Sequence, residues 1–212
     1  MKKIFSLFKN RKFLKIAGSL LLLIILLSIY IVFQELNGRI FIDNSLIQAP
    51  VITISPSQSG KVQEIDVQEG QTVQTGDTLA VVGSETLRAE TDGLIISASD
   101  LTGSAVNPET QLIQMIRPVN LRVSGTIDEN KGLNDIRVGQ VVSFTVDALP
   151  GNTFWGYVSE ISPSAVAPSF SFSASSERAT QQFVVYAKFN SAAYPNIKNG
   201  MSAKMTVYTQ TR

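Results

Sequence analysis

An uncharged, apolar run near the N-terminus most constrains what this chain can fold into. Residues 1–15 carry six positive charges and no acidic residue, and residues 16–33 follow without any charge. Those 18 residues would span about 27 Å as an α-helix, close to the thickness of a hydrocarbon core. The sequence therefore predicts a cytoplasmic basic tail over residues 1–15 and a transmembrane helix over residues 16–33.

A cleaved secretory signal is the alternative interpretation of this segment. Such signals have an apolar region of about 7 to 15 residues that ends in a small-x-small cleavage site. Here the run is longer and closes on SIYIVFQEL, residues 28–36, which offers no such site. An uncleaved anchor fits better, and the positive-inside rule places its N-terminus in the cytoplasm. We expect a single-pass protein of the cell (inner or cytoplasmic) membrane with the bulk of the chain extracytoplasmic.

The part of the chain beyond this run has the pattern of an all-β protein. Short runs rich in Val, Ile, Thr and Phe recur about every ten residues, separated by Gly, Asn, Asp and Pro, and no long amphipathic helical pattern is present. The predicted strands are Val51–Ser55, Lys61–Val67, Thr78–Val82, Gly93–Ser97, Gln111–Ile116, Asn120–Ile127, Val141–Val146, Phe154–Ile161, Phe183–Phe189 and Ser202–Thr209.

A repeat of 33 residues lies within the first half of this β region. The shift aligns turn glycines and core-type apolar residues, where backbone geometry and burial restrict the choice of residue most. The identical pairs are Gly60 with Gly93, Gly70 with Gly103, Val73 with Val106 and Leu79 with Leu112. Units this short cannot bury an apolar face separately, so we expect two copies that interlock in one small sandwich. Chance similarity between two hairpins is the alternative.

Composition argues against side-chain chemistry. The chain has no His and no Cys, which excludes His-dependent triads, thiol nucleophiles, haem attachment, Cys/His zinc sites and disulfides. It carries no P-loop, GxSxG or dinucleotide-binding glycine motif. With 18 basic and 17 acidic residues, it offers no broad basic surface to nucleic acid. We therefore predict no enzyme, no catalytic residue, no cofactor or metal, and no nucleic-acid partner.

Three segments, in order, resemble HlyD-type membrane fusion proteins, the extracytoplasmic adaptors of efflux and secretion systems. Residues 59–79 (SGKVQEIDVQEGQTVQTGDTL) resemble the first half of a biotinyl/lipoyl domain, and residues 89–116 resemble its second half. Residues 138–163 (VGQVVSFTVDALPGNTFWGYVSEISP) are similar to the β-barrel domain of that family, and residues 197–205 (IKNGMSAKM) to its last turn and strand.

The resemblance implies a mainly β fold. After the transmembrane helix we expect a linker or membrane-proximal strand over residues 34–49, which could pair with the C-terminal strand. A lipoyl-like β-sandwich (barrel-sandwich hybrid) over residues 50–118 and a small antiparallel β-barrel over residues 119–209 then follow. A Ser-rich loop, residues 162–180, interrupts the barrel. It is either a plain surface loop or a partner-docking loop with Phe170 and Phe172 as contacts.

Two departures from the pattern matter. Lipoyl and biotin carriers present a modifiable Lys at the hairpin between the two halves, but residues 83–88 (GSETLR) contain none, and Lys61 falls on a predicted strand. Many adaptors insert a long helical hairpin at the same place, whereas about six residues stand here. Even fully extended, six residues reach only about 20 Å, so this adaptor would not dock a distant tunnel.

The resemblance implies an adaptor subunit of a membrane export complex. It would assemble on an inner-membrane transporter, an ABC permease first and a proton-driven exporter second, and form a homo-oligomeric ring that serves as an extracytoplasmic conduit. In ring-forming members a polar loop of the lipoyl-like domain can line the pore, and the matching turn is Thr102, Gly103 and Ser104. The alternative function is a free-standing envelope assembly scaffold or surface-binding protein without a transport role.

Overall fold

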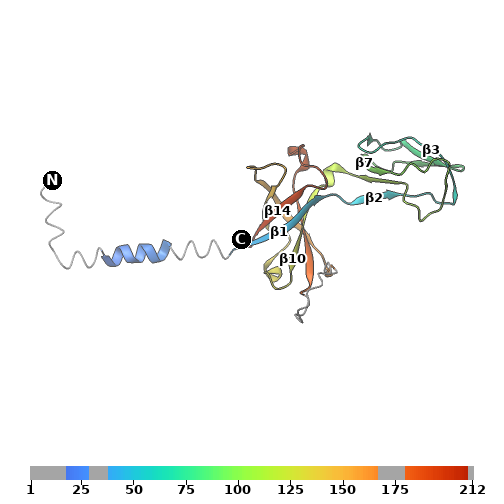
Figure 1. Cartoon of the computed structure of the whole chain (residues 1–212). Coiled ribbons are helices and arrows are strands. Elements are labelled where there is room, and N and C mark those ends of the chain that lie inside the picture. Colours follow the sequence, from blue (N-terminus) through green and yellow to red (C-terminus); the bar gives the residue numbers. More distant parts are fainter. Residues whose placement is uncertain (1–17, 29–37, 167–179, 210–212) are drawn as a thin grey trace.

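The structure is a computed structural model that describes residues 18–28, 38–166 and 180–209 (Figure 1). Residues 18–28 form an α-helix whose side chains are all exposed. They are the only described part of the predicted membrane span, since residues 16–17 and 29–33 lie outside the described ranges. Within those ranges, no helix has both the length and the apolar character needed to cross a bilayer.

Beyond the helix the described chain forms two β bodies that lie next to each other in space (Figure 1). The first is a closed antiparallel barrel with the strand order β1-β10-β13-β12-β11-β14. Its strands are β1 (Arg39–Gln48), β10 (Arg122–Asp128), β11 (Val141–Val146), β12 (Phe154–Ile161), β13 (Gln182–Lys188) and β14 (Ser202–Tyr208). Short 3-10 turns stand at η2 (Leu133–Asp135) and η3 (Ser191–Ala193).

The second body is a sandwich of two four-stranded sheets, with the orders β2-β9-β7-β4 and β6-β5-β3-β8. Its strands are β2 (Val51–Ile54), β3 (Gly60–Ile65), β4 (Thr72–Val73), β5 (Thr78–Val82), β6 (Glu85–Arg88), β7 (Gly93–Ala98), β8 (Ala105–Val106) and β9 (Ile113–Ile116). Two connections join sandwich and barrel, one between β1 and β2 and one through η1 (Pro118–Asn120) between β9 and β10.

Strand registers confirm the predicted 33-residue repeat. The β3–β5 ladder pairs Val62 with Val82, and the β7–β9 ladder pairs Ile95 with Met115, which are the same positions 33 residues later. Both ladders contain a register shift at the next position, between residues 62 and 64 and between residues 95 and 97. The sandwich is thus pseudo-symmetric, so chance similarity between two hairpins does not account for the match.

The two repeats exchange their short strands. β3 of the first repeat pairs with β8 of the second, with Gly60 opposite Val106. β7 of the second repeat pairs with β4 of the first, with Gly93 opposite Val73. Neither repeat completes its own sheet, and one cluster of buried side chains from both repeats fills the sandwich, including Val62, Leu79, Ile95 and Leu112. The predicted interlocking of the two halves is therefore confirmed.

The barrel core depends on alternation along its strands and on a group of aromatic rings. Phe144 lies 5.4 Å from Phe154 and 5.0 Å from Phe189 between ring centroids, and Tyr194 closes the group at 4.9 Å from Phe154. Such tilted and edge-on contacts are favourable geometries for buried rings. The core also includes Ile116 from the end of β9, so the last sandwich strand is fixed directly to the barrel.

All ten predicted strands occur, with ends that differ by a few residues. Strands β4, β6 and β8 were not predicted because they are only two to four residues long. Residues 39–48, expected as a linker or membrane-proximal strand, form β1 and take part in the barrel. The expected pairing of this segment with the C-terminal strand is confirmed, with Arg39 opposite Tyr208 and Leu46 opposite Ser202.

Gly60 and Gly93 are equivalent in the two repeats, but we expect a side chain to destabilise the fold more at Gly93 than at Gly60. A Cβ on Gly93 would meet the Met115 side chain and lie 2.7 Å from the Ile116 carbonyl oxygen, whereas a Cβ on Gly60 would lie 3.0 Å from a Val82 methyl and no nearer than 3.3 Å to backbone, at the Gly83 nitrogen. Because backbone moves less readily than a methyl group, we expect Gly93→Ala to destabilise by about 1–3 kcal/mol and Gly60→Ala by clearly less. Urea unfolding of both variants measures this, and an equal loss would contradict it.

Candidate functional site

The acidic side chains of the described residues form no candidate metal site. In residues 18–28, 38–166 and 180–209, no three Asp or Glu side chains come together as a metal site would require. The whole chain also lacks His and Cys. The candidate sites of this chain are the loops at the two ends of the sandwich and the exposed surface of the barrel.

The predicted pore-lining turn Thr102–Ser104 is an exposed turn with a fixed backbone. Gly103 has a φ of +85°, a conformation that glycine adopts without strain. Its amide donates to the Val62 carbonyl over 2.8 Å, and the Val62 amide donates to the Ser104 carbonyl over 2.9 Å. These bonds hold the turn against β3 and leave the hydroxyl side chains of Thr102 and Ser104 in solvent.

This turn lies at the end of the sandwich away from the barrel. It follows β7, which begins beside the barrel-core residue Ile116 and ends at Ala98, opposite Ile113. Next to Val62 along β3, the Lys61 carbonyl accepts a hydrogen bond over 2.8 Å from Gly83, which belongs to the link between the two repeats. The symmetry-equivalent turn, around Gly70, has a φ of +84°. It lines a cleft with Pro195 and Ile197 and so faces the barrel. Equivalent turns of the two repeats thus meet different surroundings.

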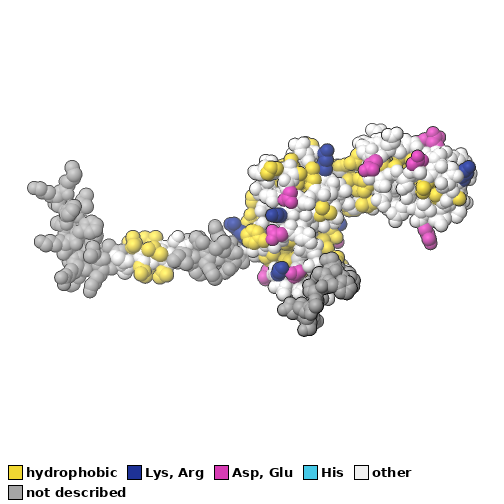
Figure 2. All heavy atoms as spheres, viewed as in Figure 1, with side chains coloured by type: hydrophobic (Ala, Val, Ile, Leu, Met, Phe, Trp, Pro, Cys, Tyr) yellow, Lys and Arg dark blue, Asp and Glu magenta, His cyan; other side chains and the backbone are white. Residues whose placement is uncertain are grey.

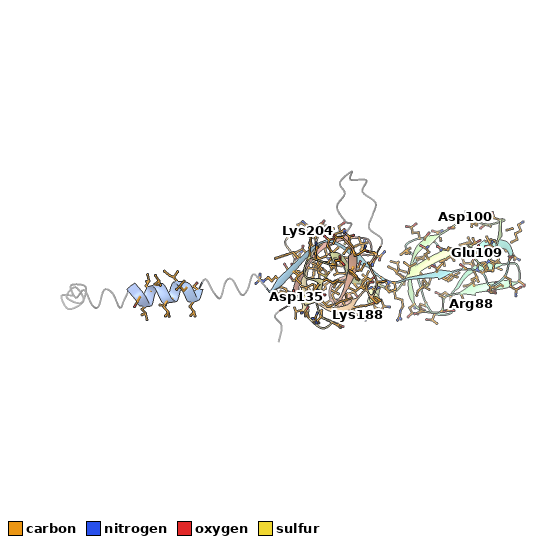
Figure 3. All side chains as sticks on the ribbon, turned by 90° about the horizontal axis from the view of Figure 1, so that it is seen from below. Arg88, Asp100, Glu109, Asp135, Lys188 and Lys204 are labelled. Atoms are coloured by element: carbon orange, nitrogen blue, oxygen red, sulfur yellow. The ribbon has the colours of Figure 1, made fainter. Side chains whose placement is uncertain are left out.

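A groove of about 370 Å³ lies between the two turns, lined from the first repeat by residues such as Gln68 and Glu69 and from the second by Asp100 and Thr102. Both charged side chains in it are acidic. Residues 50–118 carry nine acidic and three basic residues, a net charge of −6. Asp100 and Glu109 project from the sandwich (Figure 3), and acidic side chains predominate over basic ones on its visible face (Figure 2). The turn therefore presents neutral hydroxyls in an acidic surrounding.

The link between the two repeats is even shorter than the sequence indicated. β5 ends at Val82 and β6 begins at Glu85, so only Gly83 and Ser84 lie outside strands. The Glu85 carboxylate accepts hydrogen bonds from the Ser57 amide at 3.0 and 3.2 Å, which fixes the tip to the segment before β3. Lys61 lies in β3, as predicted, and not in the link.

A second contact fixes the loops at the barrel-facing end of the sandwich. The Thr75 amide and hydroxyl both donate to Asp92 Oδ1, over 2.8 and 2.9 Å. The amide hydrogen bond, followed by the hydroxyl bond, holds the pKa of the Asp92 carboxyl below its usual value. Asp92 directly precedes Gly93 and β7, so this contact fixes the turn after β4 in the first repeat to the start of the second.

The Ser-rich segment is described only at its ends. The predicted docking residues Phe170 and Phe172 lie outside the described residues, so their role remains a prediction. Before the gap, Val166 forms an isolated antiparallel bridge with Gln182 at the start of β13.

The barrel carries an aromatic surface that sequence reasoning found only in part. Neighbouring residues of a strand face opposite sides, and here Phe154 is buried in the barrel core while Trp155 is exposed. The ring of Trp155 stacks on Tyr208 with centroids 5.8 Å apart. Phe41 on β1 is also exposed. The expected pairing of residues 34–49 with the C-terminal strand is the sequence signal that places Phe41 near Tyr208.

No family model matches the sequence, but two relatives do. The efflux system component YhbJ of Bacillus subtilis (strain 168) is 34% identical over 122 residues, which cover 56% of this chain and 55% of that protein. The nodulation protein NolF of Rhizobium meliloti (strain 1021) is 37% identical over 83 residues, covering 39% and 22%. The chain thus matches about half the length of the first relative and about a fifth of the second.

Solved structures share the fold. The membrane fusion protein Spr0693 of Streptococcus pneumoniae R6 aligns with a TM-score of 0.59 at 15% identity, over 82% of this chain and 99% of that one. A MacA–MexA chimera that contains the Pseudomonas aeruginosa MexA α-hairpin domain aligns with a TM-score of 0.65 at 15% identity, over 81% and 82%. Together with the named relatives, these likenesses confirm the resemblance that was stated from the sequence.

The Asp92 contact predicts a contribution to acid sensitivity. A carboxyl whose pKa is lower in the folded chain stabilises it above the unfolded pKa of about 3.9, and that stability is lost as the pH falls through the folded pKa. We expect Asp92→Asn to lose less stability than the native chain between about pH 6 and about pH 2. Thr75→Ala keeps the amide donor to Asp92 but removes the hydroxyl donor, so its loss of stability should lie between those of the native chain and Asp92→Asn. Urea unfolding across this pH range tests the order, and three identical curves would contradict it.

Proposed function

We propose that this chain, which resembles HlyD-type membrane fusion proteins in sequence and in fold, is an adaptor subunit of a membrane export complex. It would assemble on an inner-membrane transporter, an ABC permease in the first instance, and form a homo-oligomeric extracytoplasmic conduit. The chain itself carries no nucleotide-binding motif, so a partner must supply the energy. The names of YhbJ, an efflux system component, and Spr0693, a membrane fusion protein, support the proposal.

The observation that carries this proposal is the interlocked sandwich fixed on a closed barrel without a carrier lysine at its tip. A lipoyl or biotin carrier needs a modifiable Lys that swings between active sites, and Gly83–Ser84 cannot supply one. What remains is a rigid, chemically inert module that can act by shape and assembly. The two-residue link also supports an adaptor that works close to the membrane, because it has no reach toward a distant tunnel.

The helix over residues 18–28 supports an anchor. It exposes apolar side chains on every side, from Leu20 through Leu27, and a helix that is apolar all round is stable when buried in protein or lipid. The six positive charges before it favour a cytoplasmic N-terminus. We therefore propose a single-pass anchor over residues 16–33, with sandwich and barrel on the extracytoplasmic side.

We further propose that Thr102, Gly103 and Ser104 line the conduit when copies assemble. The support is local: the turn is exposed, its backbone is fixed to Val62, and it lies at the end of the sandwich away from the barrel. A fixed backbone that presents hydroxyl groups can form a narrow polar constriction in a ring without moving. The equivalent turn around Gly70 faces the barrel and serves as an internal comparison.

The anchor is tested by charge substitution in the helix. Each Arg at the centre of a membrane helix costs about 3 kcal/mol, so Leu23→Arg with Ile24→Arg should move the chain from the carbonate-resistant membrane fraction to the soluble fraction. Leu23→Ala with Ile24→Ala should stay in the membrane. A native chain that carbonate releases quantitatively would overturn the anchor.

The export role is tested in cells by deletion and by one pair of matched variants. We expect deletion to abolish export of the transported compound, and the native chain to co-purify from mild detergent with a permease. Ser104→Trp should reduce export by about tenfold or more with assembly intact, since a bulky side chain would fill a narrow constriction. Gln71→Trp, at the symmetry-equivalent position near the barrel, should leave export unchanged.

Two outcomes would contradict the export role. A strictly monomeric particle without any co-purifying membrane protein would remove the ring and the transporter together. Normal export after deletion, combined with loss of an envelope component, would instead favour the free-standing assembly scaffold. If Ser104→Trp and Gln71→Trp behave alike, the adaptor stands and the assignment of the pore-lining turn fails.

A further inference from the structure

Four aromatic side chains gather on the outer face of the barrel and are here called the aromatic patch: Phe41, Trp155, Tyr157 and Tyr208. Three of them are largely in solvent, with exposed fractions of 66% for Phe41, 53% for Trp155 and 51% for Tyr157. Soluble monomers rarely leave several large apolar side chains together in water, and such a patch marks a surface that another phase or molecule covers.

Strand pairing brings the patch together from distant parts of the sequence. Across the barrel wall, Phe41 lies opposite Thr206, Thr206 lies opposite Ser143, and Ser143 lies opposite Trp155. In this row the small, buried Ser143 separates the larger side chains. Its hydroxyl is 3.1 Å from the Tyr208 hydroxyl, so Tyr208 lies over the middle of the row and joins it to Trp155.

The patch is amphipathic as well as aromatic. The Arg39 guanidinium lies 5.4 Å from the centroid of the Tyr208 ring, within the range of a cation–π contact. Trp and Tyr combine an apolar body with a polar group and concentrate at the level of lipid headgroups. An Arg beside them can pair with the lipid phosphates at the depth of the headgroups. This composition suits the interfacial zone of a bilayer.

The position of the patch in the chain points to the same occupant. Arg39 begins β1 and lies 11 residues after Ser28, the last described residue of the apolar helix. Eleven residues reach at most about 40 Å when fully extended. Hydrophobic side chains are visible on the barrel next to the point where the chain enters it (Figure 2). A chain held by that helix keeps this face near the bilayer surface at high effective concentration.

We propose that the aromatic patch rests on the extracytoplasmic face of the lipid bilayer, with Trp155 at headgroup depth. This inference rests on the proposed anchor and adds a second contact to it. The anchor alone does not determine which side of the barrel faces the membrane. The lipid contact fixes one side of the barrel toward the membrane and thereby orients the sandwich above it.

The chain contains its own reporter, because Trp155 is the single tryptophan in the sequence. The full chain is reconstituted in phosphatidylcholine vesicles with either plain or brominated acyl chains, and Trp emission is recorded. We expect emission at shorter wavelength than in water and about a twofold loss of intensity in brominated vesicles, as for an indole at the membrane interface. Flotation in a density gradient shows separately whether the protein is on the vesicles.

Three variants locate the effect. Trp155→Phe combined with Val119→Trp moves the reporter to η1, beside the sandwich, where Val119 is 65% exposed, and quenching should disappear. Phe41→Ser with Tyr157→Ser should shift Trp155 emission back toward that of water and reduce the quenching. Val119→Ser, which removes an equally exposed apolar side chain outside the patch, should leave the Trp155 signal unchanged.

The outcomes separate this inference from the anchor. Vesicles that float with the protein while Trp155 stays unquenched overturn the lipid contact and leave the anchor in place. Emission at short wavelength without quenching also overturns it, since a second copy or another protein then covers the patch. Failure to float overturns the anchor and the lipid contact with it. Equal quenching of Trp at positions 155 and 119 would likewise contradict the inference.

Discussion

The exchange of short strands between the two repeats is the constraint on which the rest of this structure depends. β3 needs β8 and β7 needs β4, so each sheet of the sandwich is completed only by the other repeat. The folding unit is therefore the pair, with one shared core that includes Val62 and Ile95. Long-range pairing of this kind makes folding slower but leaves no partial unit that is stable alone.

The barrel depends on a comparable long-range closure, because its first and last strands pair with each other. β1 and β14 begin 163 residues apart, at Arg39 and Ser202, and close the wall as the first and last described strands. Ile116 then enters the barrel core from the sandwich, and the Ala49 amide donates to Asn199 Oδ1 over 3.0 Å on the other connection. Sandwich and barrel are thereby fixed to each other at both connections.

The sequence predicted the strands whose pattern is local and missed what tertiary contacts create. Alternating apolar runs such as Val141–Val146 and Phe154–Ile161 predict strands directly. The glycines of the repeat can be recognised because their backbone conformations or close contacts require glycine. β4 and β8 are two residues long and exist only because a partner strand lies beside them. The aromatic patch was found only in part, because Phe41, Trp155 and Tyr208 lie on three different strands and only the tertiary strand pairing brings them together. The pore-lining turn is a prediction from the resemblance alone, because no local pattern of Thr102, Gly103 and Ser104 distinguishes it from any other polar turn.

The Gly83–Ser84 link has a consequence for how proteins with this architecture can differ in length. Both residues lie outside the ladders, and the strands on either side keep their registers through contacts with β3 and with Ser57. New chain could enter after Gly83 without disturbing a strand pairing, because the Gly83 amide would keep its bond to the Lys61 carbonyl. Closing a loop of greater length costs little free energy. The length of such a protein can thus change during evolution by insertion or deletion at this link, while the sandwich and the barrel stay the same.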